Sequence, residues 1–199
     1  MRRNQFRYYN IIIFLCAFLL GTLLLWAAQE RMAPDAILAQ AGFTPACTLP
    51  NIDEDPDVDD GAWCTASSNN VNVAVRVSFP TPVAPPTNGV DLQNFRFLVR
   101  RTAGSGTVDP TARVELWENG ALVRAGAENT VTSDTGQVFQ FTWDSAELAT
   151  NDGSLVECKI VGTKSGASPA KRSAVDIGAV EWNAETSPVP TADSLMAIQ

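Results

Sequence analysis

Carboxylates are concentrated between positions 53 and 60, where six of eight residues are acidic. Crowded carboxylates repel one another, and a hard cation such as calcium relieves that repulsion. The spacing Asp55-x-Asp57-x-Asp59 begins like a calcium loop, but the glycine arrives one position late and Ala66 replaces the closing bidentate acid. An EF-hand is therefore excluded. The alternatives are a solvated acidic turn and a looser calcium site ligated by Asp53, Asp55, Asp57 and Asp59.

Cys47 and Cys64 flank this acidic segment. Outside the cytoplasm they can close it with a disulfide, which contributes about 3 kcal/mol for a loop of this size in the chain-entropy model. Cys158 has the inward parity of its expected strand, so we predict a small buried hydrophobic residue there and not a reactive thiol. Apart from possible calcium, no cofactor is predicted.

Trp63 and Trp117 are the candidate residues for stacking a ligand. Trp117 has the outward parity of its expected strand, and Trp63 lies just past the acidic segment. Exposed tryptophans on a β-sandwich are how many carbohydrate-binding modules stack sugar rings. The alternative for both is packing in the core or at an edge, which we predict for Trp143 and Trp182 because they end strands.

The chain has no histidine, which excludes Ser-His and Cys-His nucleophile pairs and every histidine-containing metal site. Paired acids such as Glu115 with Glu118, or Asp176 with Glu181, would suit a glycosidase. Acids on the strand faces of an acidic protein are usually just solvated, however. We therefore predict no catalytic residue and no enzyme. The net charge of −8 also disfavours nucleic acid as a partner.

The elements that must position these residues are β-strands. Apolar residues alternate with polar ones over 71–79, 95–100, 112–116, 139–143 and 155–161, which is the period of half-buried strands. Asn119-Gly120 between two apolar runs predicts a tight hairpin. Asp144 and Glu147 form a capping box for one helical turn. The parity change across Gly178 predicts a bulge.

Seven or eight strands without a strong helix in the body of the chain predict an all-β fold. We expect an antiparallel β-sandwich, jelly-roll or immunoglobulin-like, preceded by one N-terminal hydrophobic helix. The expected organisation is a basic segment (1–10), an apolar membrane segment (11–28), a linker (29–43), the sandwich (44–185) and a flexible tail (186–199).

The apolar run 11–28 is long enough to cross a bilayer and follows three arginines, so the domain is expected outside the cytoplasm. The segment is either retained as a signal anchor or removed as a signal peptide, since Ala39-Gln40-Ala41 before Gly42 has the form of a cleavage site. A third alternative takes Met32 as the true start of the chain.

Four short segments of the sequence carry a resemblance to a known group of proteins. They are DEDPD at 53–57, VRVSFPTP at 75–82, ARVELWENG at 112–120 and VDIGAVEW at 175–182. In these, the chain resembles small β-sandwich proteins encoded in bacteriophage and prophage genomes, over about residues 33–186. The resemblance implies a tail, fibre or decoration module that contributes surface and not chemistry, and that lies in a virion if Met32 is the true start.

Two functions follow as hypotheses. The first is a non-catalytic structural or adhesion sandwich, displayed at a cell surface or built into a virion. The alternative is a carbohydrate-binding module, possibly calcium-dependent, that uses the acidic segment and the exposed tryptophans.

Overall fold

The computed structural model describes residues 28–52, 55–58, 61–88, 93–102, 106–150, 152–166 and 168–186. The expected segment 1–10, the expected membrane segment up to residue 27, two of the four candidate calcium ligands (Asp53 and Asp59) and the tail beyond 186 lie outside these residues. Those predictions are therefore untested.

The described residues form strands and three short 3₁₀ helices. They are β1 (Ala28–Met32), β2 (Ala36–Ala41), η1 (Leu49–Asn51), β3 (Val73–Ser78), β4 (Gln93–Arg101), β5 (Thr111–Glu118), β6 (Ala121–Ala125), β7 (Asn129–Thr130), β8 (Gln137–Trp143), η2 (Ser145–Glu147), β9 (Val156–Thr163), η3 (Pro169–Lys171) and β10 (Val175–Thr186).

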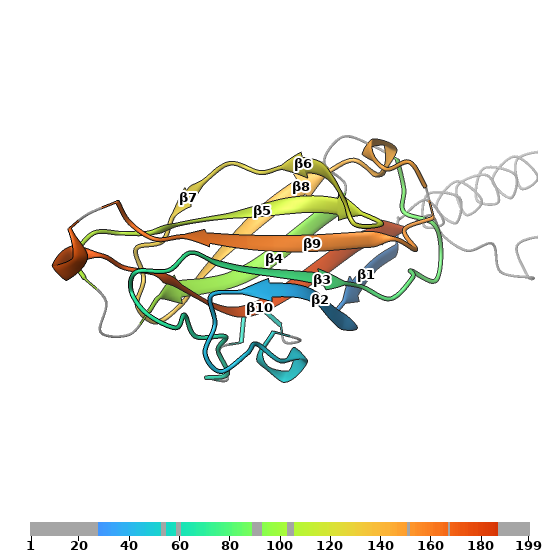
Figure 1. The fold of residues 1–199 in the computed structure, drawn as a ribbon. Helices are drawn as coiled ribbons and strands as arrows, with labels where there is room; N and C mark the ends of the chain where they lie inside the picture. Colours follow the sequence, from blue (N-terminus) through green and yellow to red (C-terminus); the bar gives the residue numbers. More distant parts are fainter. Residues whose placement is uncertain are drawn as a thin grey trace, which may run out of the picture.

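Two antiparallel sheets lie face to face (Figure 1). The four-stranded sheet has the order β1-β10-β4-β8, and the six-stranded sheet has the order β2-β3-β9-β5-β6, with β7 also paired to β5. The prediction of an all-β antiparallel sandwich is confirmed. Among the described residues, no helix is both long and apolar enough to span a bilayer.

The core lies between the two sheets because the apolar period of the central strands is two. Phe95 and Phe97 of β4 and Trp182 of β10 are fully buried, and Phe95 lies 5.5 Å from Trp143 between ring centroids. Cys158 is also fully buried, as its parity predicted. Burial raises the pKa of its thiol far above the ordinary value, so it is inert.

Two local predictions are confirmed by the backbone. Asn119 and Gly120 join β5 to β6 with φ of 47° and 78°, the left-handed pair that a type I′ hairpin turn requires. The register of β10 on β4 shifts between Ile177 and Ala179, so Gly178 is a bulge. The bulge keeps both Ile177 and Val180 in the core although their parity differs.

The capping box is also confirmed. The Asp144 side chain accepts a hydrogen bond from the Ala146 amide, and Glu147 accepts one from the Asp144 amide at 2.9 Å. This closes the single turn of η2 where β8 leaves its sheet.

The expected linker 29–43 is instead part of the sandwich. β1 pairs with β10, from Ala28 opposite Thr186 to Met32 opposite Trp182, and β2 pairs with β3. Neither strand shows a clear period of two, because both are edge strands whose pairing is decided by the neighbouring strand and not by their own pattern. The folded unit therefore begins at least sixteen residues before the expected boundary at 44.

Candidate functional site

The acidic segment is bound to arginines of the four-stranded sheet. Asp55 accepts a hydrogen bond from Arg31 of β1 at 3.0 Å, and Asp57 accepts a short one from Arg96 of β4. Glu181 of β10 lies between the two arginines, 3.4 Å from Arg96 and 3.9 Å from Arg31. Positive charge is thus already supplied to both described carboxylates by the protein itself.

This arrangement differs from the one expected of a calcium site. Among the described residues, no group of three or more acids, histidines or cysteines could hold a metal ion. The hydrogen bond from Arg96 holds the pKa of Asp57 below its ordinary value, so this carboxylate stays charged and paired. Asp55 and Asp57 therefore dock the segment on the sheet, while calcium binding that involves Asp53 and Asp59 stays a prediction.

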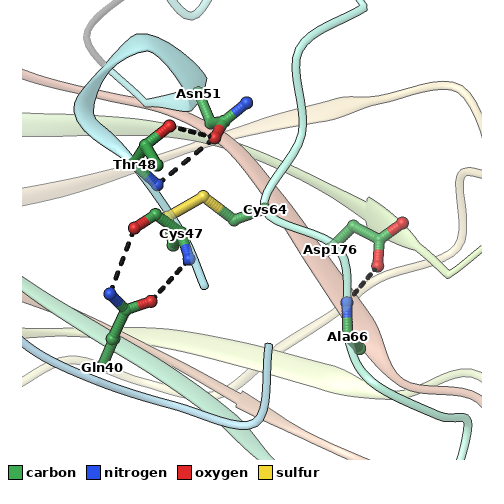
Figure 2. Close-up of a disulfide and its surroundings, with 7 residues drawn as sticks. All are labelled: Gln40, Cys47, Thr48, Asn51, Cys64, Ala66 and Asp176. Carbon is green, nitrogen blue, oxygen red and sulfur yellow. Dashed lines mark hydrogen bonds between the residues drawn. A yellow bond between two sulfur atoms is a disulfide. The ribbon is translucent and has the colours of Figure 1, made fainter. Parts of the chain in front are cut away.

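A disulfide joins Cys47 and Cys64, with their Cα atoms 4.9 Å apart (Figure 2). The Cys47 backbone exchanges two hydrogen bonds with the Gln40 side chain of β2, at 2.6 and 3.1 Å. The Cys64 backbone exchanges two with Ile177 of β10, at 2.8 and 3.1 Å. The bridge therefore connects the edge of one sheet to the edge of the other along this side of the sandwich.

Trp63 is not exposed, contrary to the prediction that it could stack a ligand. It is 9% exposed and packs on Leu98 and Ala179, on the outer face of the four-stranded sheet. The Arg100 guanidinium carbon lies 4.1 Å from the centroid of its ring. Because the neighbouring Cys64 is bonded to β10, the chain carries Trp63 over that face, where it covers apolar side chains.

Trp117 is on the outer face of the six-stranded sheet and is half-buried. Its indole Nε1 donates a hydrogen bond to Glu115 at 3.0 Å. The guanidinium carbon of Arg76 on β3 and the ammonium of Lys159 on β9 each lie 4.9 Å from the centroid of its ring. These contacts immobilise the indole, so its position is set before any ligand arrives.

An open hollow of about 370 Å³ lies beside Trp117. We call it the Trp117 groove, and it is lined by Ala39, Gln40, Ala41, Ala74, Arg76, Trp117 and Lys159. The hollow exists because alanines of β2 and β3 present only methyl groups next to the long side chains of their neighbours. Its volume lies within the roughly 300–1,000 Å³ that small-ligand sites span.

Glu115 supports the groove from below. It is 4% exposed and accepts hydrogen bonds from Arg113 at 2.8 and 3.1 Å, and its carboxylate lies 3.3 Å from the Lys159 ammonium. Burial alone would raise the pKa of Glu115, but the hydrogen bonds from Arg113, Trp117 and Lys159 outweigh it and lower the pKa. A charged Glu115 therefore orients both Trp117 and Lys159.

The acids considered for catalysis are all held in such contacts. Glu118 accepts hydrogen bonds from the amides of Ala149 and Thr150, both at 2.7 Å. Asp176 accepts bonds from the Ala66 amide at 3.0 Å (Figure 2), from the Thr102 hydroxyl at 2.8 Å and from Arg100 at 3.2 Å. Neither expected pair shares a described hollow, so their contacts are those of residues that hold loops and strands together.

A second hollow, of about 350 Å³, lies between β6 and β8. Its cation, Arg124, lies over the Phe141 ring at 4.7 Å, bonds the Thr142 carbonyl and pairs with Glu147 at 3.1 Å. The charged group of this hollow therefore binds the residues that form it, through one hydrogen bond and one ion pair.

The residues that complete the Trp117 groove were not among the candidates from the sequence. Arg76 and Lys159 share the outward parity of Trp117 on their own strands, and that signal was visible. What the sequence did not show is that β3 and β9 lie next to each other, with Arg76 opposite Lys159. The alanines of β2 were not considered because they lie in the segment that was predicted to be a linker.

Comparison with known proteins gives no family. No family model matches the chain, and no curated protein matches it. Solved structures that match include an isomalto-dextranase from Arthrobacter globiformis (16% identity, TM-score 0.40, 77% of this chain and 23% of that one). Others are a family 32 carbohydrate-binding module from C. perfringens (11%, TM-score 0.39, 78% and 92%) and a family 35 module from Clostridium thermocellum (13%, TM-score 0.37, 78% and 98%).

The resemblance to bacteriophage proteins is thereby corrected. The structural neighbours are carbohydrate-binding modules and glycoside hydrolase domains and not phage structural proteins, so the resemblance and the virion role that it implied are dropped. Alternation of apolar and polar residues is common to β-sandwiches, so a likeness of strand sequences does not identify a role. With TM-scores of 0.40 or less, these neighbours carry no argument about what this chain binds.

Proposed function

We propose that the domain is a non-catalytic carbohydrate-binding module that holds a glycan in the Trp117 groove. The observation that carries the proposal is an immobilised indole beside an open hollow, with the hydrogen-bond donors of Arg76 and Lys159 on the same rim. Sugar rings present both apolar C–H faces and hydroxyl groups. An aromatic ring next to polar side chains matches both features.

The proposal of a non-catalytic role rests on chemistry. The chain has no histidine to act as a general base. Glu115, which pairs with the groove residue Lys159, is buried and is held by Arg113, Trp117 and Lys159. A carboxylate held in this way orients the neighbouring side chains, and because it is buried it does not contact a substrate in the groove.

We also propose that the domain works outside the cytoplasm, either anchored through residues 11–28 or secreted. The Cys47–Cys64 bridge supports this, since disulfides persist in oxidising compartments. The uncharged apolar run after three arginines supports it independently. Cleavage before Gly42 would remove β1 and β2 from the sandwich, so retention of the apolar segment fits the fold better.

The test is a glycan array probed with the protein, with and without a calcium chelator. We expect binding of at least one glycan, with affinity reduced about tenfold or more in Trp117→Ala, because the groove loses an apolar wall and Arg76 and Lys159 lose the ring that positions them. Leu122→Ala is the matched control, since Leu122 is 52% exposed on the neighbouring strand and does not line the groove. A chelator effect would implicate the acidic segment.

An array that stays silent under both conditions would contradict glycan binding. The domain would then be assigned a structural or adhesion role. Retained binding in Trp117→Ala, with binding lost in Leu122→Ala, would place the glycan on a different part of the sheet.

A further inference from the structure

The charged side chains that line the Trp117 groove are cationic. Arg76 and Lys159 contribute to its wall with 22% and 29% of their side chains exposed. The acids that pair with them, Glu157 and Glu115, are 8% and 4% exposed and do not line the groove. A ligand in the groove therefore meets the charged groups as donors, while the balancing negative charge lies beneath the surface.

Arg76 also differs from Arg101 and Arg113 in having unused donors. Arg101 donates two hydrogen bonds to Asp134, at 2.6 and 2.8 Å. Arg113 donates two to Glu115, at 2.8 and 3.1 Å. In the described part of the chain, Arg76 has a 3.5 Å ion pair with Glu157 and a 3.4 Å hydrogen bond to the Gly120 carbonyl.

Within those same residues, Arg76 Nε is buried beside Glu157 and makes no hydrogen bond, so the donors left for a ligand are those of the two Nη groups, of which Nη1 makes one long bond. The Arg76 guanidinium is nevertheless held in place by its stacking on Trp117. A planar, positioned fork with spare N–H groups is suited to a carboxylate, which accepts two parallel hydrogen bonds from it.

From these contacts we infer that the groove selects a glycan that carries a carboxylate, that is, a uronic-acid-containing oligosaccharide. The inference rests on the proposed glycan-binding function. The carboxylate lies between the Arg76 guanidinium and the Lys159 ammonium, and the sugar ring lies over the alanines of β2 and β3 beside Trp117.

The charge of the whole chain limits how acidic this glycan can be. At a net charge of −8 the protein repels a dense polyanion at long range, whereas one carboxylate in contact with two cations is attracted locally. The ligand class is therefore a sparsely charged oligosaccharide. Sulfated polymers and nucleic acids are disfavoured by the same argument.

The experiment compares matched ligands by isothermal titration calorimetry. The probes are a glucuronic-acid-substituted xylotetraose and trigalacturonate, each against its carboxyl-reduced product. We expect the acidic member of at least one pair to bind about tenfold more tightly, because charge-assisted bonds are lost on reduction. Raising NaCl from about 0.05 to 0.5 M should weaken that binding several-fold.

Variants then assign the preference to the two cations. Arg76→Gln should abolish the preference for the acidic ligand, Arg76→Lys should retain part of it, and Lys159→Met should reduce it while keeping the apolar stem. Lys171→Gln, at an exposed cation outside the groove, should change nothing. Because Lys159→Met acts independently of Arg76, one misfolded variant does not end the test.

Equal affinity for acidic and reduced ligands, with loss of both in Trp117→Ala, would overturn the carboxylate preference and keep the glycan-binding function. Binding of neutral array glycans with no binding of any acidic probe would do the same. No binding of any probe, together with a silent array, would overturn both.

Discussion

Charged side chains on both outer faces are held in networks, and this decides what each can do. Arg96, Glu181 and Asp57 dock the acidic segment, while Arg113, Glu115 and Lys159 position Trp117. Arg76 is the member whose polar contacts are long. A residue with long contacts retains donors for a ligand, whereas a saturated one contributes to the fold.

The disulfide is the residue-scale feature with the largest expected effect on stability. Replacing both Cys47 and Cys64 by serine should lower the free energy of unfolding by about 3 kcal/mol, because the open chain of the unfolded state gains entropy. Urea denaturation of the variant measures the loss. Treating the wild-type protein with a reductant is the control and should give a similar shift; an unchanged midpoint would contradict the bridge.

At the scale of elements, β10 organises the molecule. It pairs with β4 on one side, and on the other side it pairs first with the segment around Cys64 and then with β1. Because of the bulge at Gly178, β10 places side chains in the core both before and after the parity change. The acidic segment and its bridge thus cover the part of the β10 edge that β1 leaves open, which removes an exposed strand edge.

Gly178→Ala should destabilise the protein by about 1–3 kcal/mol. A Cβ atom there would lie 2.9 Å from Trp63 and 3.1 Å from Leu98, so the packed side chains must move. Gly166→Ala is the control, because a Cβ at Gly166 meets no atom within 4 Å. Thermal unfolding compares the two. Equal unfolding temperatures would show that Trp63 does not pack on the bulge.

Removing β1 and β2 should prevent stable folding. A chain that begins at Gly42 loses the edge strands of both sheets, exposes the backbone of β10 and β3, and leaves Cys47 without Gln40. A chain that begins at Ala28 is the control and should keep the native near-ultraviolet circular dichroism. Cooperative unfolding of the shorter chain would show that the two strands are dispensable.

At the scale of the whole molecule, the protein should be more stable at neutral pH than in acid. Hydrogen bonds lower the pKa of Asp57, Asp134 and Glu115. The unfolded chain therefore binds protons at a higher pH than the folded one, so this stability is present above the ordinary values of 3.8 and 4.5 and is lost as the pH falls through the lower folded values.

Urea denaturation at pH 7, 5, 4 and 3 measures the dependence, with the steepest loss expected below about pH 4.5. Glu115→Gln should be less stable than the wild type at pH 7, because Arg113 and Lys159 lose their partner. It should lose less further stability in acid. Parallel curves for the two proteins would contradict a charged Glu115 in the folded state.

The strands of the core, the hairpin at Asn119-Gly120 and the bulge at Gly178 were predictable because each is a local property. The alternation of apolar and polar residues, the turn residues and the change of strand parity can each be recognised from a few neighbouring positions. The burial of Cys158 followed from the same alternation. These local patterns are therefore enough to specify the fold class and the buried face of each central strand.

Which strands lie next to each other is a property of the folded chain as a whole, and the candidate site depends on it. Trp117, Arg76 and Lys159 meet because β3, β9 and β5 lie side by side, and Trp63 is buried because Cys64 is bonded to β10. Edge strands β1 and β2 were missed for the same reason. Pairing between distant segments follows from closing the whole core, and no local pattern specifies it.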